Sequence, residues 1–218
     1  MALTFPLAPS DLVDLMLIET VTWTLGEDQE LSGLGSGEVL ARDLGPRLWA
    51  GDASTGALDV DSIEALRGRF HTLDGAIQSF YLYDPQHPFP STDPTGAILL
   101  GSNVTISNIA ANRKEISFAG LPAGFALPMD ARFSVTALNP SRTALIQLAA
   151  PITANGGGFA GPVEVRPHLR PWLAAGQTVQ LRKPVAKVKL VPKSLSVVPV
   201  SGVTARLRFS FRQTLAAG

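Results

Sequence analysis

Apolar and polar residues alternate with a period of two in many short segments of this chain, most clearly in residues 204–212. The apolar members of that segment are Leu207, Phe209 and Phe211, and the polar members are Arg206, Arg208, Ser210 and Arg212. Successive side chains of a β-strand point to opposite faces. The segment is therefore expected to form a strand with one buried apolar face and one basic face.

Shorter runs of the same kind recur along the chain and are separated by turn residues. The 17 Pro and 20 Gly are spread throughout, which excludes long helices and favours short strands joined by turns. Strands are expected at residues 17–25, 38–43, 77–83, 97–100, 104–109, 115–118, 131–137, 143–148, 163–165, 178–181, 186–191 and 204–212. In residues 185–190 the apolar side chains alternate with Lys187 and Lys189, which are expected to face solvent. The pattern predicts a mainly β fold.

One helix is expected, at about residues 62–73. Its apolar stripe, at spacings of three and four, consists of Ile63, Leu66, Phe70 and Leu73. Asp61 is the expected N-cap, with Glu64 three residues later as in a capping box, and Gly75 is the expected stop. Gly68 costs about 1 kcal/mol relative to Ala in a helix interior. We therefore expect this helix to depend on packing rather than on propensity.

A proline-rich connector follows the next predicted strand. Residues 84–94 contain four Pro, which makes the segment stiff and extended. It predicts a domain boundary near residue 95, and a second boundary is expected near Pro184. The strands after Pro184 are expected to complete a first domain of residues 1–95, which makes residues 96–183 an inserted domain. A simple succession of domains stays open as the alternative.

The charges of this neutral chain are segregated. Residues 1–95 contain 15 acidic residues and four Arg, whereas residues 96–218 contain 14 basic and three acidic residues. No Asp or Glu follows Glu164. Such asymmetry favours a charged partner or oriented self-association. Two interpretations stay open: the basic strand touches nucleic-acid phosphates without sequence preference, or it faces acids of the same subunit or of a neighbour.

Candidate chemistry is sparse. The chain has no Cys, and its three His are dispersed, with His71 near Asp74 and His87 near Asp84 as the only close pairs with an acid. Neither pair has a third ligand nearby in the sequence, so no metal site is expected. Residues 33–37 lack the spacing of a dinucleotide or phosphate loop, and they are expected to form a turn. No catalytic residue, cofactor or enzyme activity is expected.

No targeting or membrane segment is expected either. The N-terminal residues carry acids among their apolar positions and no basic region, which does not fit a secretory signal. No apolar run approaches the ~20 residues that a membrane helix needs. We expect a protein that is made in the cytoplasm and does not insert into membranes.

Two stretches of the chain carry a resemblance to a known family. One comprises residues 31–51 and, after the expected helix, residues 73–85; the other comprises residues 163–171 and 176–184. Their layout resembles the distal tail protein family of long-tailed bacteriophages (siphoviruses) and of phage-like gene transfer agents. The resemblance extends over about residues 17–195 and rests on structural motifs, not catalytic ones.

The resemblance implies both a fold and a role. The fold would be a β-sandwich-like hub domain with one flanking helix, plus a second β-barrel or β-sandwich domain projecting outward. The role would be that of a structural virion protein in the tail: a homohexameric ring, synthesised in the bacterial host cytoplasm, that connects the tail tube protein to the tail-tip hub or baseplate protein. The ring would surround a DNA channel, with transient non-specific contact to DNA and no cofactor. The alternatives are a minor tail or tail completion protein, a neck component, or a carbohydrate-binding tail module for host attachment.

Five side chains are candidates for contacts. Trp49, after a Gly-Pro turn, is expected either in the core or as an interface anchor. The other interface candidates are Arg206, Arg208 and Arg212, which are expected to meet acids of the next subunit. Exposed ion pairs contribute only ~0–1 kcal/mol each, so these arginines would set register while apolar burial holds the ring. Trp172 is the candidate for stacking on a sugar.

Overall fold

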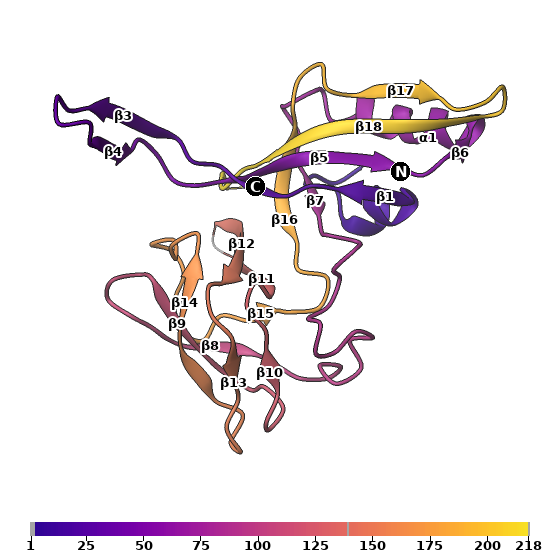
Figure 1. Cartoon of the computed structure of the whole chain (residues 1–218). Helices are drawn as coiled ribbons and strands as arrows, with labels where there is room; N and C mark the ends of the chain where they lie inside the picture. Colours follow the sequence, from indigo (N-terminus) through magenta and orange to yellow (C-terminus); the bar gives the residue numbers. More distant parts are fainter. Residues whose placement is uncertain (1–2, 139, 218) are drawn as a thin grey trace.

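The computed structural model of the chain describes residues 3–138 and 140–217. Across these residues it is mainly β with one α-helix, so the predicted fold class is confirmed. Figure 1 shows two curled groups of strands, one above the other, which we call sheet I and sheet II. Each sheet has its own buried apolar core.

The elements have the following bounds. Sheet I contains β1 (Ile18–Val21), β2 (Thr24–Leu25), β5 (Trp49–Thr55), β6 (Leu58–Asp59), β7 (Phe80–Leu82), β16 (Ala186–Leu190), β17 (Ser196–Pro199) and β18 (Thr204–Gln213). Sheet II contains β8 (Thr105–Ile109), β9 (Glu115–Ala119), β11 (Arg132–Leu138), β12 (Ser141–Leu148), β14 (Ala160–Arg166) and β15 (Val179–Gln180). Two further pairs are β3 (Gln29–Gly33) with β4 (Val39–Asp43), and β10 (Ala126–Leu127) with β13 (Ile152–Thr153). The helical segments are η1 (Pro9–Asp11), η2 (Val13–Leu15) and α1 (Val60–His71).

Sheet I is built from both ends of the chain. Its central strands run in the order β1-β5-β18-β16-β7, and every pairing is antiparallel. The C-terminal strand β18 lies between β5 and β16, with Phe209 opposite Ala53 and Arg212 opposite Lys189. The segment after Pro184 thus returns to the strands of the N-terminal segment, and sheet II is formed by the residues between them.

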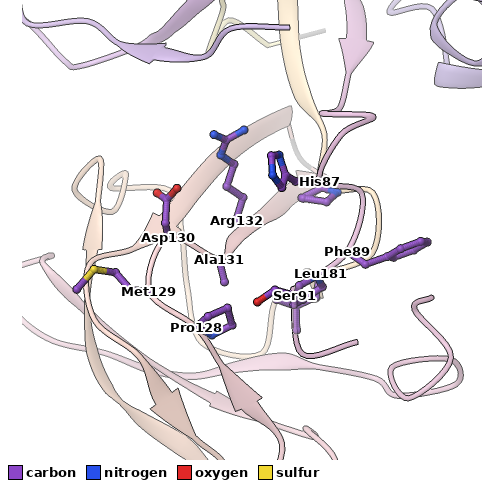
Figure 2. Close-up of a pocket in the computed structure, with 11 residues that line it drawn as sticks. His87, Phe89, Ser91, Pro128, Met129, Asp130, Ala131, Arg132 and Leu181 are labelled. Atoms are coloured by element: carbon purple, nitrogen blue, oxygen red, sulfur yellow. The ribbon is translucent and has the colours of Figure 1, made fainter. Parts of the chain in front are cut away.

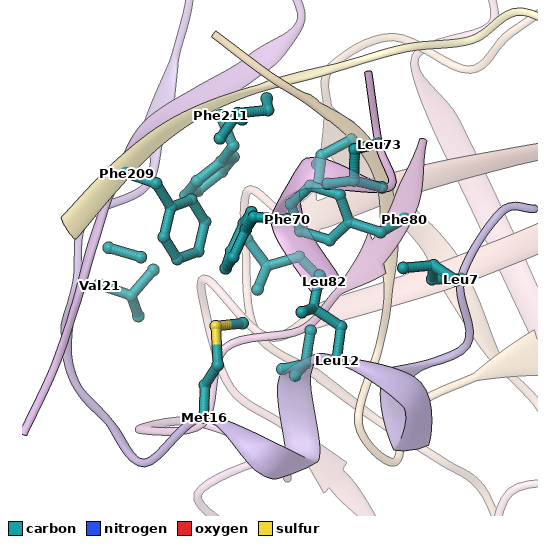
Figure 3. Packing of buried hydrophobic residues seen from close by; sticks show 14 of the residues in the cluster. Leu7, Leu12, Met16, Val21, Phe70, Leu73, Phe80, Leu82, Phe209 and Phe211 are labelled. Atoms are coloured by element: carbon teal, nitrogen blue, oxygen red, sulfur yellow. The ribbon is translucent and has the colours of Figure 1, made fainter. Parts of the chain in front are cut away.

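Burial alternates along β18 as its sequence predicts. Leu207, Phe209 and Phe211 are at most 2% exposed, whereas Arg208 and Arg212 are exposed. The Phe209 ring lies 4.8 Å from the ring of Phe70 in α1 (Figure 3). The helix and the N-terminal 3-10 segments pack on this apolar face, which leaves the basic face of sheet I open to solvent.

Helix α1 begins two residues earlier than expected, and its N-cap is Asp59 rather than Asp61. The Asp59 carboxylate accepts hydrogen bonds from the Ser62 backbone N–H (2.8 Å) and hydroxyl (2.7 Å), which lower the pKa of Asp59. The predicted N-cap was wrong because Asp59 lies three residues before Ser62, so its two carboxylate oxygens can accept from the backbone N–H and from the hydroxyl of that residue. The predicted apolar stripe is correct, since its four members are buried in the core of sheet I.

Sheet II curls into a barrel. Its strands follow the order β15-β11-β12-β14-β9-β8, and Thr105 of β8 forms an antiparallel bridge with Thr178, beside β15. The N–H of Ile106 donates to the carbonyl of Gln177 (2.9 Å), which strengthens this closure. Closure removes the exposed edges that an open sheet would present.

Several predicted strands need correction. Residues 97–100 form turns, with the N–H of Leu100 bonded to the carbonyl of Ala97, because they lie in the connector between the sheets. Strands β3, β5 and β17 fall outside the predicted runs, since their Gly, Ser and Pro content obscures the strand pattern.

Lys187 also differs from expectation. It is only 3% exposed, and its ammonium donates to the carbonyl of Ala216 at 3.2 Å. The end of the chain folds back along β16, where the N–H of Thr214 donates to the carbonyl of Lys187. Burial, followed by the charge of Lys189, lowers the pKa of Lys187.

Two glycines provide a matched test of this packing. A Cβ at Gly51 in β5 would collide with the carbonyl oxygen of Thr22, whereas nothing lies within 4 Å of a Cβ at Gly68 in α1. Gly51→Ala is expected to destabilise the protein by roughly 1–3 kcal/mol. Gly68→Ala is expected to stabilise it by about 0.5–1 kcal/mol. Guanidinium unfolding measures both, and a shared sign would contradict the packing described.

Candidate functional site

Trp49 joins the two sheets. It is 2% exposed, and its indole N–H donates to the carbonyl of Leu145 in β12 at 2.9 Å. The Leu145 side chain itself belongs to the core of sheet I, so β12 contributes to both cores. The expectation that Trp49 is an interface anchor between subunits is therefore wrong; its role as a core residue is the correct alternative.

Arg132 of β11 completes this junction. Its guanidinium carbon lies 5.7 Å and 5.5 Å from the ring centroids of Trp23 and Trp49, which is cation–π distance. Its Nη1 donates to Asp84 Oδ2 at 2.9 Å, and the His87 ring nitrogen lies 3.2 Å from the same oxygen. Figure 2 shows Arg132 and His87 beside a cavity of about 180 Å³ between the connector and β11. The Asp84 and Arg132 charges are thus mutually compensated.

The predicted pairs of His with acids do not form a metal site in the described part of the chain. Asp84 and His87 are in contact, but no group of three His, Asp or Glu residues converges among residues 3–138 and 140–217. His71 is exposed in the last turn of α1. None of the described helices combines the length and apolar character that crossing a bilayer requires.

The basic face of sheet I carries the three predicted arginines. Two of them pair within the chain: Arg206 with Glu19 and Arg212 with Asp28, each at 3.2 Å. Arg208 is exposed, and no carboxylate of the described residues lies within 4.0 Å of it. All three side chains lie on one face as predicted, but two of them meet acids of their own subunit.

A hollow of about 430 Å³ lies on this open face. Its polar lining consists of two arginines, five hydroxyl side chains and one carboxylate, that of Asp52, which accepts a hydrogen bond from the Ser210 hydroxyl; the other lining residues of this kind are Thr20, Thr22, Ser54, Ser194, Arg206 and Arg208. The buried Nε of Arg206 has no hydrogen-bond acceptor among the described residues. The hollow therefore offers a charged donor and several hydroxyls to a partner that supplies carboxylates.

The β3–β4 hairpin is the most exposed part of the molecule. All ten residues of its two strands are exposed, and the hairpin extends away from both sheets in Figure 1. At its base the N–H of Leu44 donates to the carbonyl of Asp28 (2.9 Å), and Arg47 lies 3.4 Å from Glu27. An isolated two-stranded hairpin is at best marginally stable in water. We call residues 29–43 the arm.

The arm has two different faces. Directly opposed residues share a face, and on one side the register pairs Leu31 with Ala41 and Gly33 with Val39 toward the tip, with Gln29 opposite Asp43 at the base. The other side carries Glu30 opposite Arg42, and Ser32 opposite Leu40. Leu31 and Val39 are 66% and 63% exposed, so an apolar face stands in solvent. Three apolar side chains, Leu31, Ala41 and Val39, thus gather on one face of the arm, which makes that face a candidate interaction surface.

The local sequence pattern predicts the strand and the turn of the arm but not its exposure. Residues 38–43 were expected as a strand and 33–37 as a turn, and the structure has both features. The apolar residues were indistinguishable from core residues, because alternation shows that a face is apolar without showing what covers it. The one available signal was the acidity of residues 27–43, which hold five acids and one Arg.

Trp172 lies away from these surfaces. It is half-buried and packs against the core of sheet II, and its carbonyl accepts a hydrogen bond from the Gln177 amide at 3.3 Å. Its suggested contact with a glycan stays a prediction.

Comparisons with known proteins add no relative. No protein-family model matches the chain, and no curated protein matches it. The arm and the open face of sheet I are therefore the features of the chain that bear on its function.

The junction between the sheets gives a pH-dependent prediction. The Tyr83 hydroxyl donates to Asp14 at 2.6 Å and Lys183 lies 3.3 Å away; together they lower the pKa of Asp14 from its ordinary 3.8. Because the folded pKa is depressed, the stabilisation is present above pH 3.8 and is lost as the pH falls through the folded pKa. Asp14→Asn should lower the melting temperature at neutral pH, and this difference should shrink in acid. A difference independent of pH would contradict the role of the charge.

Proposed function

We propose that this chain is a structural subunit that assembles into a closed homo-oligomeric ring, with the arm of each copy docked on the open face of sheet I of the next. The arm is the observation that carries the proposal, since it exposes an apolar face that its own subunit does not cover. A contact between two different surfaces of one chain is heterologous, and it forms a ring when its rotation closes.

The charges of the two surfaces are complementary. The arm and its base carry two arginines, Arg42 and Arg47, against five acids, which are Glu27, Asp28, Glu30, Glu38 and Asp43. The open face presents Arg208 without an acidic partner and Arg206 with one uncompensated donor. The ion pairs that Arg206 and Arg212 form within the chain are exposed, so they contribute only ~0–1 kcal/mol each and can exchange partners cheaply.

Apolar burial supplies most of the expected contact energy. Full burial of a Leu or Val side chain contributes roughly 1.5–3 kcal/mol. Leu31 and Val39 of the arm are available for this, and Val198 beside Arg206 on the open face is 36% exposed. Charge complementarity would select the register of the two surfaces, and apolar contact would hold them together.

The resemblance to distal tail proteins gives this ring a place. In that setting the ring is a homohexamer in the virion tail that joins the tail tube protein to the tail-tip hub or baseplate protein around a DNA channel. The two-sheet architecture, with the inserted barrel between N- and C-terminal strands, supports the proposal. A minor tail or tail completion protein is the alternative, and the position of the subunit in labelled particles distinguishes the two. No catalytic role is proposed.

Removal of the arm tests the assembly directly. The backbone bond between Asp28 and Leu44 already brings the ends of the arm together, so residues 29–43 can be replaced by an Asn-Gly turn. We expect a folded monomer with an unchanged melting temperature and no rings, measured by light scattering and negative-stain electron microscopy. Rings formed by the armless protein would refute the proposed contact.

A pair of double substitutions separates the two faces of the arm. Leu31→Ser with Val39→Ser removes the apolar face, and Glu30→Ala with Arg42→Ala alters the polar face without changing the net charge. The first variant should weaken assembly at least tenfold, which corresponds to about 1.4 kcal/mol. The second should change it much less. Equal losses would mean that the apolar face has no special role.

Assembly should also depend on salt. Screening shortens the Debye length from about 10 Å at 0.1 M to about 3 Å at 1 M. We therefore expect sedimentation to show fewer rings as the concentration of sodium chloride rises. Arg208→Glu should weaken assembly more than Lys193→Glu, a matched charge reversal in the loop before β17. Assembly that is indifferent to salt and to Arg208→Glu would remove the electrostatic part of the proposal.

A further inference from the structure

A second cavity, of about 330 Å³, lies where the base of the arm meets sheet II. Its charged or titratable lining residues are Asp43, Arg47, Lys114, Arg166, His168 and Arg170. They come from three segments: the end of β4 with the loop that follows it, the turn before β9, and the residues at and after the end of β14. Four cationic side chains thus converge on one cavity with a single lining carboxylate.

The cations of this cavity are incompletely compensated. Arg47 lies 3.6 Å from Asp43, and Arg166 lies 2.7 Å from Glu164. For Lys114 and Arg170, in contrast, no carboxylate of the described residues lies within 4.0 Å. Lys114 is exposed, whereas Arg170 is half-buried, and a partly buried charge without a counter-ion is unfavourable.

Arg170 is the most constrained of these groups. Its Nη2 donates to the carbonyl of Arg47 at 2.6 Å, which fixes the guanidinium against the loop that leads into β5. Burial lowers the pKa of Arg170, and a neutral carbonyl cannot balance its charge. An anion in the adjacent cavity would balance the charge of Arg170.

We infer that this cavity binds a phosphate group, either free or as part of a phosphodiester. A planar guanidinium fork matches the oxygens of a phosphate, and lysine adds a point charge beside it. Arg47 and Arg166 already have carboxylate partners, so Lys114 and Arg170 are the cations that an anion would balance. A free phosphate and a phosphodiester both present non-bridging anionic oxygens that these two side chains can bind. The inference does not depend on ring formation, because the cavity lies within one chain.

His168 provides a reporter at the cavity. Burial, then the charges of Arg166, Lys114 and Arg47, lower the pKa of His168, and Glu164 opposes this. Asp43 also interacts with His168. A bound phosphate adds negative charge, so it should raise the pKa of His168. The ring signals of His71 and His87, which do not line the cavity, serve as internal controls.

The test is an NMR titration of the histidine ring signals in the full chain at constant ionic strength. One titration uses inorganic phosphate against chloride, and a second titration uses a short oligothymidylate. Saturable movement of the His168 signals alone is expected. Lys114→Ala should weaken the affinity about tenfold, as expected for loss of a charge-assisted contact worth about 1.4 kcal/mol. Lys193→Ala, which removes an exposed lysine elsewhere, should leave the affinity within about twofold.

The outcomes separate the sources of the phosphate. Saturation by inorganic phosphate identifies a site for the free ion, and saturation by the oligonucleotide alone identifies a site for a phosphodiester. Lys114→Ala should fold normally, because the Lys114 N–H donates to the Asn112 side chain and the carbonyl accepts from Val165 irrespective of the side chain. Arg166→Gln, which removes another of the four cations that line the cavity, serves as the second variant. The proposal would be overturned if the His168 signals did not move in either titration, or if Lys193→Ala lost as much affinity as Lys114→Ala.

Discussion

The ten-residue strand β18 lies between β5 and β16, and this pairing is the constraint on which the rest of the structure depends. Sheet I is complete only when β18, from the C-terminal end of the chain, pairs with β5, from the N-terminal segment. The same strand buries Phe209 against α1 and turns Arg208 toward solvent. Because Phe209 pairs with Ala53 across a large separation in sequence, closing sheet I carries the entropic cost of a long loop. Sheet II, which fills that loop, closes on itself as a barrel.

Polar and aromatic contacts fix sheet II against sheet I, together with the burial of the Leu145 side chain of β12 in the core of sheet I. Trp49 donates to the backbone of β12, and Arg132 lies against two indole rings while it pairs with Asp84. Such contacts are directional, so they define one orientation of the two sheets. That orientation also brings Lys114 and Arg170 to the base of the arm. The joint therefore determines both where the barrel sits and where the cationic cavity forms.

The arm, unlike the junction between the sheets, leaves apolar side chains exposed to solvent. Its strands satisfy each other's hydrogen bonds but leave Leu31 and Val39 in water, which an isolated chain gains nothing from. The open face of sheet I has the opposite property, since it displays cations and hydroxyls around a hollow. One surface lacks an apolar cover, and the hollow on the other is lined by two arginines and a single carboxylate, that of Asp52. A second copy of the chain can supply the cover and further carboxylates, which is why the proposed function takes the form of a ring.

The sequence by itself determined the class of fold, the buried face of β18 and the apolar stripe of α1, because these depend on local periodicity and period decides which side chains share a face. Only the tertiary structure decided what covers each face. Trp49 could be placed in a core but not between two sheets, and Lys187 lost its solvent face because the end of the chain folds back onto it. Likewise the sequence pattern around Leu31 is that of a core residue, but the side chain is exposed in the folded chain. Contacts between residues far apart in the sequence leave no local pattern, so the arm, the junction and the cationic cavity were visible only once the chain was folded.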